Sequence, residues 1–140
     1  MFIFERENAK PILGPTAKML VRQLSFLRCY GKSSFACLTD SEGNWVQVGG
    51  GGTTCVLERK EAQTGLLFRA EQVPPVMPAE FDNAELCFGA NRIKLRQGEW
   101  FHLRQIVEVF ICFLQGQPFP TNLRWQIIRL EGEAKAPDEG

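Results

Sequence analysis

The residues of this chain whose types best suit chemistry are its thiols and its lone imidazole. The five cysteines are Cys29, Cys37, Cys55, Cys87 and Cys112. No two of them have the short spacing of a metal-binding pair, and an odd number without a CxxC motif is a poor framework for disulfides. His102 could act with a distant cysteine in a zinc site or in catalysis only if the fold brought them together. We therefore predict free and mostly buried thiols, with no metal site and no cofactor.

Four consecutive glycines, Gly49–Gly52, raise the question of a phosphate-binding loop. Such a loop needs a lysine followed by serine or threonine at the start of a helix, where backbone N–H groups meet the phosphate. Here the strand-like segment Thr53–Leu57 follows instead. We expect the glycines to form a flexible connection or a bulge between strands, and a binding loop is the less favoured alternative.

The segment from Asp40 to Trp45 is the first candidate for contact with another protein. Residues 40–43 have the composition of a turn between two strands, and Trp45 lies at the edge of that turn. An aromatic side chain flanked by acids at the edge of a loop can anchor a protein interface. Trp45 could equally pack into the core. We keep Asp40, Glu42 and Trp45 as candidate partner-binding residues.

A stripe of three cations is the second candidate. Arg92, Lys94 and Arg96 alternate with apolar residues. In a strand this alternation places all three cations on one exposed face. The stripe could bind an anion or an acidic patch of a partner, although the simpler interpretation is the solvated face of a half-buried strand.

Two helices are expected to position these residues. Thr16 can cap a helix from Ala17 to about Cys29, with Gly31 ending it. A second helix is expected from Trp100 or Leu103 to Leu114, with Gly116 as its C-cap.

The remaining pattern predicts strands. They cover residues 34–39, 44–48, 53–60, 66–72, the hairpin 86–96 and 122–130. Glu58 and Arg69 should face each other across one hairpin. The segregated order of helices and strands indicates an α+β fold, with a mainly antiparallel sheet of about six strands and two helices. Residues 1–130 should form one domain, followed by a disordered tail over residues 131–140.

Composition limits the classes of function. With 140 residues, 44% of them hydrophobic, the chain is long enough for one domain with its own core. A formal charge of zero gives no indication of direct nucleic-acid binding, and the apolar stretches are too short to cross a membrane. Glu5 and Arg6 interrupt the apolar start, unlike a secretory leader. We expect a cytoplasmic monomer or homodimer.

The second half of the chain carries a family resemblance. Residues 93–128, IKLRQGEWFHLRQIVEVFICFLQGQPFPTNLRWQII, contain an amphipathic helix, a short proline-containing loop and a strand with tryptophan. This segment resembles the C-terminal part of a family of bacterial polymorphic-toxin immunity proteins associated largely with nucleic-acid deaminase toxins. The resemblance implies a small, non-enzymatic protein that binds a cognate toxin domain in the cytosol and blocks its active site.

Two other classes stay open. An adaptor or chaperone of a bacterial secretion system would have the same size and also act by binding. A small thiol-dependent enzyme has the least support, because no two carboxylates and a base form a convincing catalytic set in the sequence.

Overall fold

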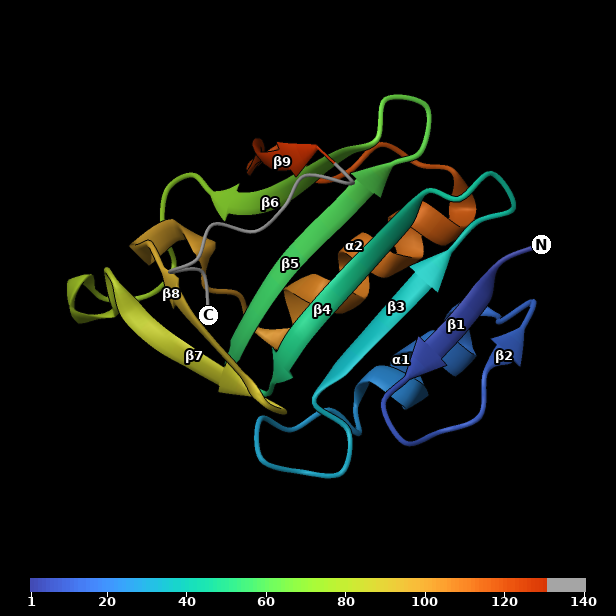
Figure 1. Ribbon diagram of the computed structural model, residues 1–140, viewed down its shortest axis with the longest axis horizontal. Helices are drawn as coiled ribbons and strands as arrows, with labels where there is room; N and C mark the ends of the chain where they lie inside the picture. The colour runs from blue at the N-terminus through green and yellow to red at the C-terminus, as the bar shows by residue number, and fades with distance from the viewer. Residues whose placement is uncertain (131–140) are drawn as a thin grey trace.

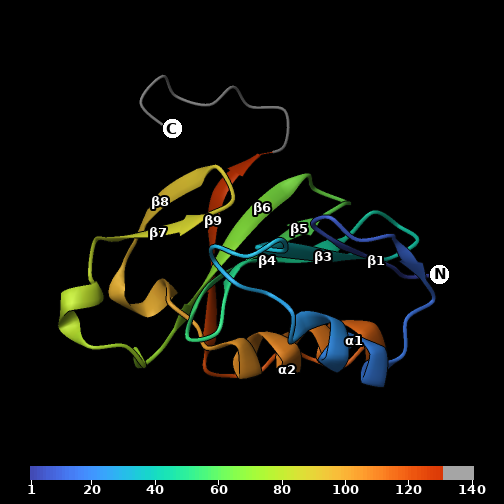
Figure 2. The ribbon, with the colours of Figure 1, turned by 90° about the horizontal axis from the view of Figure 1, so that it is seen from below.

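The computed structural model describes residues 1–130, which form an antiparallel sheet with two α-helices on one face (Figures 1 and 2). The main sheet has seven strands in the order β2-β1-β3-β4-β5-β6-β9, and β7 and β8 form a separate hairpin. The elements are β1 (Ile3–Arg6), β2 (Ile12–Leu13), α1 (Ala17–Leu24), β3 (Phe35–Thr39), β4 (Trp45–Gly51), β5 (Thr54–Glu61), β6 (Leu66–Gln72), β7 (Ala84–Phe88), β8 (Asn91–Leu95), α2 (Leu103–Gln115) and β9 (Leu123–Leu130). The predicted α+β class is confirmed.

The sheet exceeds the predicted size of about six strands because β1 and β2 were not expected. β1 pairs with β3 and places Phe4 opposite Leu38, and both side chains are buried in the core. β2 has only two residues and pairs with the start of β1. Strands this short show too little alternation to be recognised in a sequence. Pairing with distant segments defines them.

The first helix is shorter than predicted. The Thr16 hydroxyl accepts a hydrogen bond from the backbone N–H of Met19, so the N-cap is confirmed. The helix ends at Leu24 and not near Cys29, because Ser25 caps it and the chain turns. Leu20 and Leu24 are buried as expected, whereas Met19 is 47% exposed and lies outside the core.

The second helix agrees with its prediction. It runs over Leu103–Gln115, and Gly116 adopts a left-handed φ of 67° at its C-cap. Glycine is favoured there because it has no Cβ to clash with the backbone. Ile106, Val109 and Phe110 of this helix are buried between it and the sheet. Both helices cover the same face of the sheet, as the view from below shows (Figure 2).

The hairpin β7–β8 stands over the opposite face of the sheet, at one end (Figure 2). Leu86 and Leu95 from the hairpin join Val56 and Trp100 in a second apolar cluster. Trp100 is 2% exposed and is therefore a core residue of this cluster. Within residues 1–130, no helix or hairpin covers the rest of that face, toward the turn between β3 and β4 (Figures 1 and 2). We call this area the open face.

The glycine run does not form the predicted flexible connection. Gly49, Gly50 and Gly51 are the last residues of β4. A Cβ on Gly49 would lie 2.6 Å from the ring of Phe88 in the hairpin, and one on Gly51 would lie 2.3 Å from the carbonyl oxygen of Leu27. Glycine therefore lets β4 pass tightly between the hairpin and the segment that follows α1.

β9 forms an edge of the main sheet. Leu123 and Trp125 pack against the core on the helix side, as their alternation predicts. Ile127 is 61% exposed, so the predicted apolar face of this strand only partly joins the core. A register shift opposite Leu67 and Phe68 interrupts the pairing near this point. The predicted tail over residues 131–140 lies outside the described residues. Within residues 1–130, no helix is both long and apolar enough to span a bilayer.

Candidate protein-binding surface

The turn between β3 and β4 is held in shape by a side chain that was predicted to contact a partner. One carboxylate oxygen of Asp40 accepts hydrogen bonds from the backbone N–H groups of Glu42 and Asn44, both at 2.9 Å, and the other accepts from the Asn44 amide. Asn44 in turn accepts the backbone N–H of Ala62 at 2.7 Å. Asp40 thus orders the turn, which leaves Glu42 exposed at its tip.

Trp45 lies at the rim of the open face. It is the first residue of β4 and pairs in register with Thr39 of β3 and Lys60 of β5. Its side chain is half-buried, so it is neither a core residue nor a fully solvated one. A large aromatic group in this position offers apolar area to a partner while its rotamer is restrained by its neighbours.

Only two of the three cations of the predicted stripe lie together on one face of the hairpin. Arg92 and Lys94 are exposed on the outer face of the hairpin, opposite Cys87 and Glu85. Arg96 follows the end of β8 and is also exposed, but it turns toward another set of side chains. Its guanidinium lies 3.7 Å from Glu71 and 3.9 Å from Glu99, and it donates to the amide of Gln126. Arg96 therefore ties the hairpin to β6 and β9.

The structure does not bring the two predicted contact regions together. The turn over Asp40–Asn44 lies at one end of the sheet, and the hairpin that carries Arg92 and Lys94 lies at the other end (Figure 1). A rigid partner domain centred on one of them need not touch the other. The surface around Trp45 and the hairpin surface are two separate candidates.

A cluster around Arg59 was missed by sequence reasoning. The guanidinium carbon of Arg59 lies 4.2 Å from the ring centre of Phe68, 4.8 Å from that of Trp125 and 5.8 Å from that of Phe119. We call these four residues the Arg59 cluster. Strand alternation contained a signal, because Arg59 shares a face with the buried Leu57 and so points toward the helix side.

The predicted cross-strand ion pair is confirmed. Glu58 pairs in register with Arg69, and one of its carboxylate oxygens accepts hydrogen bonds from two guanidinium nitrogens at 3.0 and 2.8 Å. Both side chains are about one-fifth exposed, at 20% each, on the open face. This pair occupies the centre of that face with charges that already satisfy each other.

Burial makes three of the five thiols less acidic than an ordinary cysteine. All five cysteines are free. Burial raises the pKa of Cys37 to about 11 and that of Cys55 to about 12, and it also raises the pKa of Cys112. A raised thiol pKa lowers the fraction of reactive thiolate at neutral pH. Among residues 1–130, no three His, Cys, Asp or Glu side chains are grouped as metal ligands.

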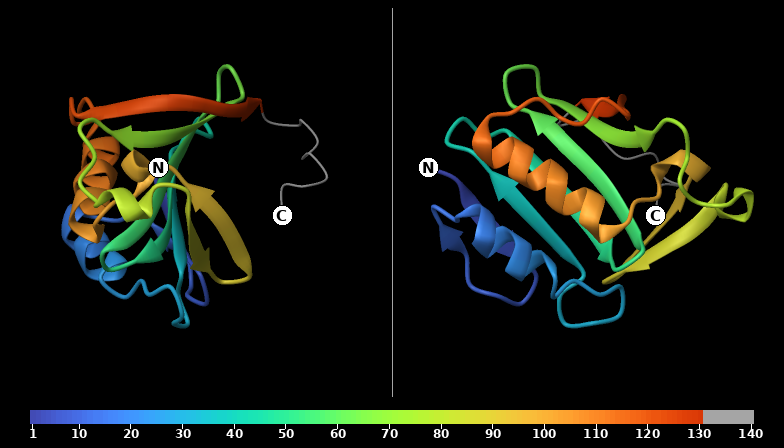
Figure 3. Two further views of the ribbon diagram at one scale, coloured as in Figure 1. Left: turned by 90° about the vertical axis from the view of Figure 1, so that its left-hand side faces the viewer. Right: turned by 180° about the vertical axis from the view of Figure 1, so that it is seen from behind.

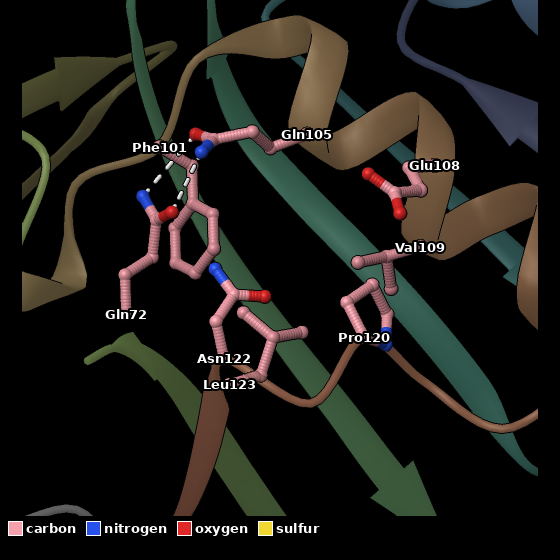
Figure 4. Close-up of a pocket in the computed structure, with 8 residues that line it drawn as sticks. All are labelled: Gln72, Phe101, Gln105, Glu108, Val109, Pro120, Asn122 and Leu123. Atoms are coloured by element: carbon pink, nitrogen blue, oxygen red, sulfur yellow. Dashed lines mark hydrogen bonds between the residues drawn. The ribbon is translucent and has the colours of Figure 1, made fainter. Parts of the chain in front are cut away.

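A small hollow lies between the start of α2 and the loop that precedes β9 (Figure 4). At its inner end, the amides of Gln72 and Gln105 bond to each other at 3.2 and 2.6 Å. Gln72 also donates to the carbonyl oxygen of Trp100 at 2.8 Å. Because these amides already satisfy each other, their pairing is structural: it joins β6 to α2.

Comparison with known proteins adds no family to this geometry. No protein-family model, no curated protein and no solved structure matches the chain. Residues 93–128, which carry the resemblance to toxin immunity proteins, span most of β8, all of α2 and most of β9. That resemblance stays a prediction, and the function rests on the surfaces described above.

Proposed function

We propose that this protein is an immunity protein that binds and neutralises a cognate bacterial toxin acting inside the cell. The toxin domain is of the nucleic-acid-targeting kind, such as a deaminase, as the resemblance of residues 93–128 implies. Neutralisation works by stoichiometric binding that blocks the active site of the toxin. The protein itself needs no catalytic residue, metal or cofactor for this task.

One observation carries the proposal. Side-chain hydrogen bonds hold the turn between β3 and β4 in one shape, and this turn presents Glu42 and Trp45 beside the open face. Asp40 and Asn44 hold the turn through hydrogen bonds within the chain, so little conformational entropy is lost when a partner binds it. Trp45 supplies the aromatic anchor, and the exposed Glu42 supplies a charge that influences association rate and choice of partner. A rigid loop with an aromatic anchor suits tight protein binding better than catalysis.

The test is a search for a toxin-type reading frame beside the gene, followed by co-expression of its product with this protein. We expect wild-type protein to restore growth and to co-purify with the toxin domain. Trp45→Ala should weaken the complex by tenfold or more, since loss of an aromatic anchor costs about 2 kcal/mol or more. Isothermal titration calorimetry with the purified toxin domain measures this loss.

Tyr30→Ala is the matched control. Tyr30 is 90% exposed in the loop after α1, at the opposite end of the sheet from the turn. Its removal should leave both rescue and affinity unchanged. If wild-type protein neither binds nor rescues, the immunity function is wrong, and an adaptor role in secretion becomes the leading alternative. If a folded Trp45→Ala protein binds as wild type does, the surface is wrong and the function stands.

A further inference from the structure

Arg59 is a partly buried cation without a hydrogen-bonded acceptor. Its Nε atom is buried and has no partner, and within residues 1–130 its guanidinium donates no hydrogen bond. The nearest carboxylate oxygen, on Glu61, lies 3.9 Å away, while the other oxygen of Glu61 accepts from Thr64 at 2.8 Å. Arg69, one strand away, is by contrast held by two hydrogen bonds to Glu58. The side chains of Arg59 and Arg69 face opposite sides of the sheet, and only the guanidinium of Arg69 has a hydrogen-bonded acceptor within residues 1–130.

The three aromatic rings hold the Arg59 guanidinium in place but do not satisfy its donors. Contacts between a cation and aromatic faces are attractive, and more so when the cation is desolvated. They fix the orientation of the planar group and leave its N–H edge free to bond elsewhere. Burial lowers the pKa of Arg59, which agrees with a charge that is incompletely solvated. The terminal nitrogens also lack a hydrogen-bonded acceptor within residues 1–130, and they belong to a guanidinium that burial partly desolvates, so an incoming carboxylate gains more here than at a fully solvated arginine.

The surroundings of Arg59 resemble the centre of a protein interface. Its side chain is 22% exposed, so the terminal nitrogens are accessible from outside. Ile127 pairs in register with Phe68 beside the cluster and is 61% exposed. Arginine and tryptophan within an apolar rim are the residues that dominate binding energy in interfaces. The loop from α2 to β9, which carries Phe119, crosses the ends of β5 and β6 here (Figure 3).

The Arg59 cluster lies at the same end of the sheet as the turn with Trp45. Val46 and Trp45 of β4 pair in register with Arg59 and Lys60 of β5. Arg59 points to the helix side, and Trp45 points to the open face. The turns β3–β4 and β5–β6 both lie at this end of the sheet (Figures 1 and 3). A partner that approaches this end of the sheet can therefore contact both.

We propose that Arg59 binds a carboxylate of the partner protein, on an aspartate or glutamate whose apolar neighbour contacts Ile127. This inference rests on the proposed function, because it assigns a second contact to the same partner. The planar fork of one guanidinium satisfies one carboxylate through paired N–H···O bonds. Phosphate sites, in contrast, usually combine several donors with a helix N-terminus, which the cluster does not include.

The direct test needs no partner. In the full-length protein, the Nη–Hη signals of the Arg59 guanidinium are followed by nuclear magnetic resonance while sodium acetate replaces sodium chloride at constant ionic strength. We expect a saturable shift of the Arg59 signal. Arg104, exposed in the first turn of α2, is the internal control and should show a weaker, non-saturating response. If Arg59 responds no more strongly than Arg104, the carboxylate site is wrong.

The second test measures affinity for the cognate toxin domain by calorimetry. Arg59→Met removes the charge and should weaken binding by roughly 10- to 100-fold. Arg59→Lys keeps the charge but loses the planar fork and should also weaken it by about tenfold. Arg104→Met should bind as wild type does. Melting temperatures identify any variant that fails to fold, and the lysine variant then decides.

The outcomes separate the two proposals. If wild-type protein does not bind the toxin but acetate binds at Arg59, the immunity function fails and the carboxylate site stands. If wild-type protein binds and both folded Arg59 variants bind equally well, the function stands and the role of Arg59 is wrong.

Discussion

At the scale of single residues, the fold reassigns several side chains and backbone positions. Asp40 was predicted to contact a partner, but both of its carboxylate oxygens already accept hydrogen bonds from residues of its own turn. No local pattern in the sequence singled out Arg59. In the structure its guanidinium lies over the ring of Phe68, and its buried Nε atom has no hydrogen-bond partner within residues 1–130. Gly51 reads as part of a flexible run, but it lies against the backbone of Leu27. For Arg59 and Gly51 the deciding contact comes from a distant part of the chain, whereas Asp40 is held by residues of its own turn.

The tight position of Gly51 leads to a prediction about stability. In Gly51→Ala the new methyl group would meet the Leu27 carbonyl, a backbone group that cannot rotate away. We expect the free energy of unfolding to fall by roughly 1–3 kcal/mol, as in other overpacked sites. Urea denaturation measures it. Gly52→Asn is the control, because Gly52 has no neighbour within 4 Å of a Cβ and its φ of 61° suits asparagine. Equal tolerance of both changes would restore the flexible-connection interpretation.

At the scale of elements, α2 does most to cover the sheet. Its inner side chains contact the main core, while Arg104 and Glu108 stay exposed on its outer side. The helix begins at Leu103, two residues after Phe101, and Phe101 pairs with Cys55 through two backbone hydrogen bonds at 2.9 and 2.8 Å. This pairing and the Gln72–Gln105 amides fix the start of α2 against β5 and β6. Through these contacts, α2 sets the position of the loop that carries Phe119.

Among the side chains of α2, truncation of Phe110 should lower the free energy of unfolding the most. It is fully buried at 0% exposure. Phe110→Ala should lower the free energy of unfolding by roughly 3–5 kcal/mol, because it removes a large apolar group and leaves a cavity. Glu108→Ala, on the exposed side of the same helix, should change it by less than about 0.5 kcal/mol. Chemical denaturation of the two variants gives both values, and a cost for Phe110 near that of Glu108 would place it outside the core.

At the scale of the whole molecule, two layers meet at the sheet, and buried thiols lie on both of its sides. Cys55 is fully buried and belongs to the main core on the helix side. Cys37 pairs in register with Gln47 and lies on the open face. Burial raises the pKa of both thiols above the ordinary value of 9.0, so the folded state holds their protons more strongly than the unfolded chain does.

This difference predicts a loss of stability at alkaline pH. The contribution of these thiols is fully present below pH 9.0, the ordinary thiol pKa. Above it the unfolded chain releases protons that the folded chain keeps, so the free energy of unfolding should fall as pH rises toward about 11. Denaturation at several pH values measures the slope. Cys37→Ala should make that slope shallower; an unchanged slope would mean that Cys37 is solvated in the native state.

Local patterns in the sequence were enough to predict much of the architecture. The spacing of apolar residues identified α2, and Gly116 marked its end, because both signals depend on neighbours within one or two turns of helix. Alternation and turn residues identified the hairpins, and strand pairing then brought Glu58 opposite Arg69. The α+β class followed from the order of these elements.

Long-range contacts decided the rest. The short strand β2 exists because β1 lies beside it, and Gly49 and Gly51 of β4 leave room for Phe88 and Leu27, which lie where a Cβ would be. The Arg59 cluster joins β5, β6, β9 and the loop after α2, segments far apart in the chain. No local pattern can show that four such segments meet, because the free energy that joins them comes from burial and cation–aromatic contact, both of which depend on the complete fold.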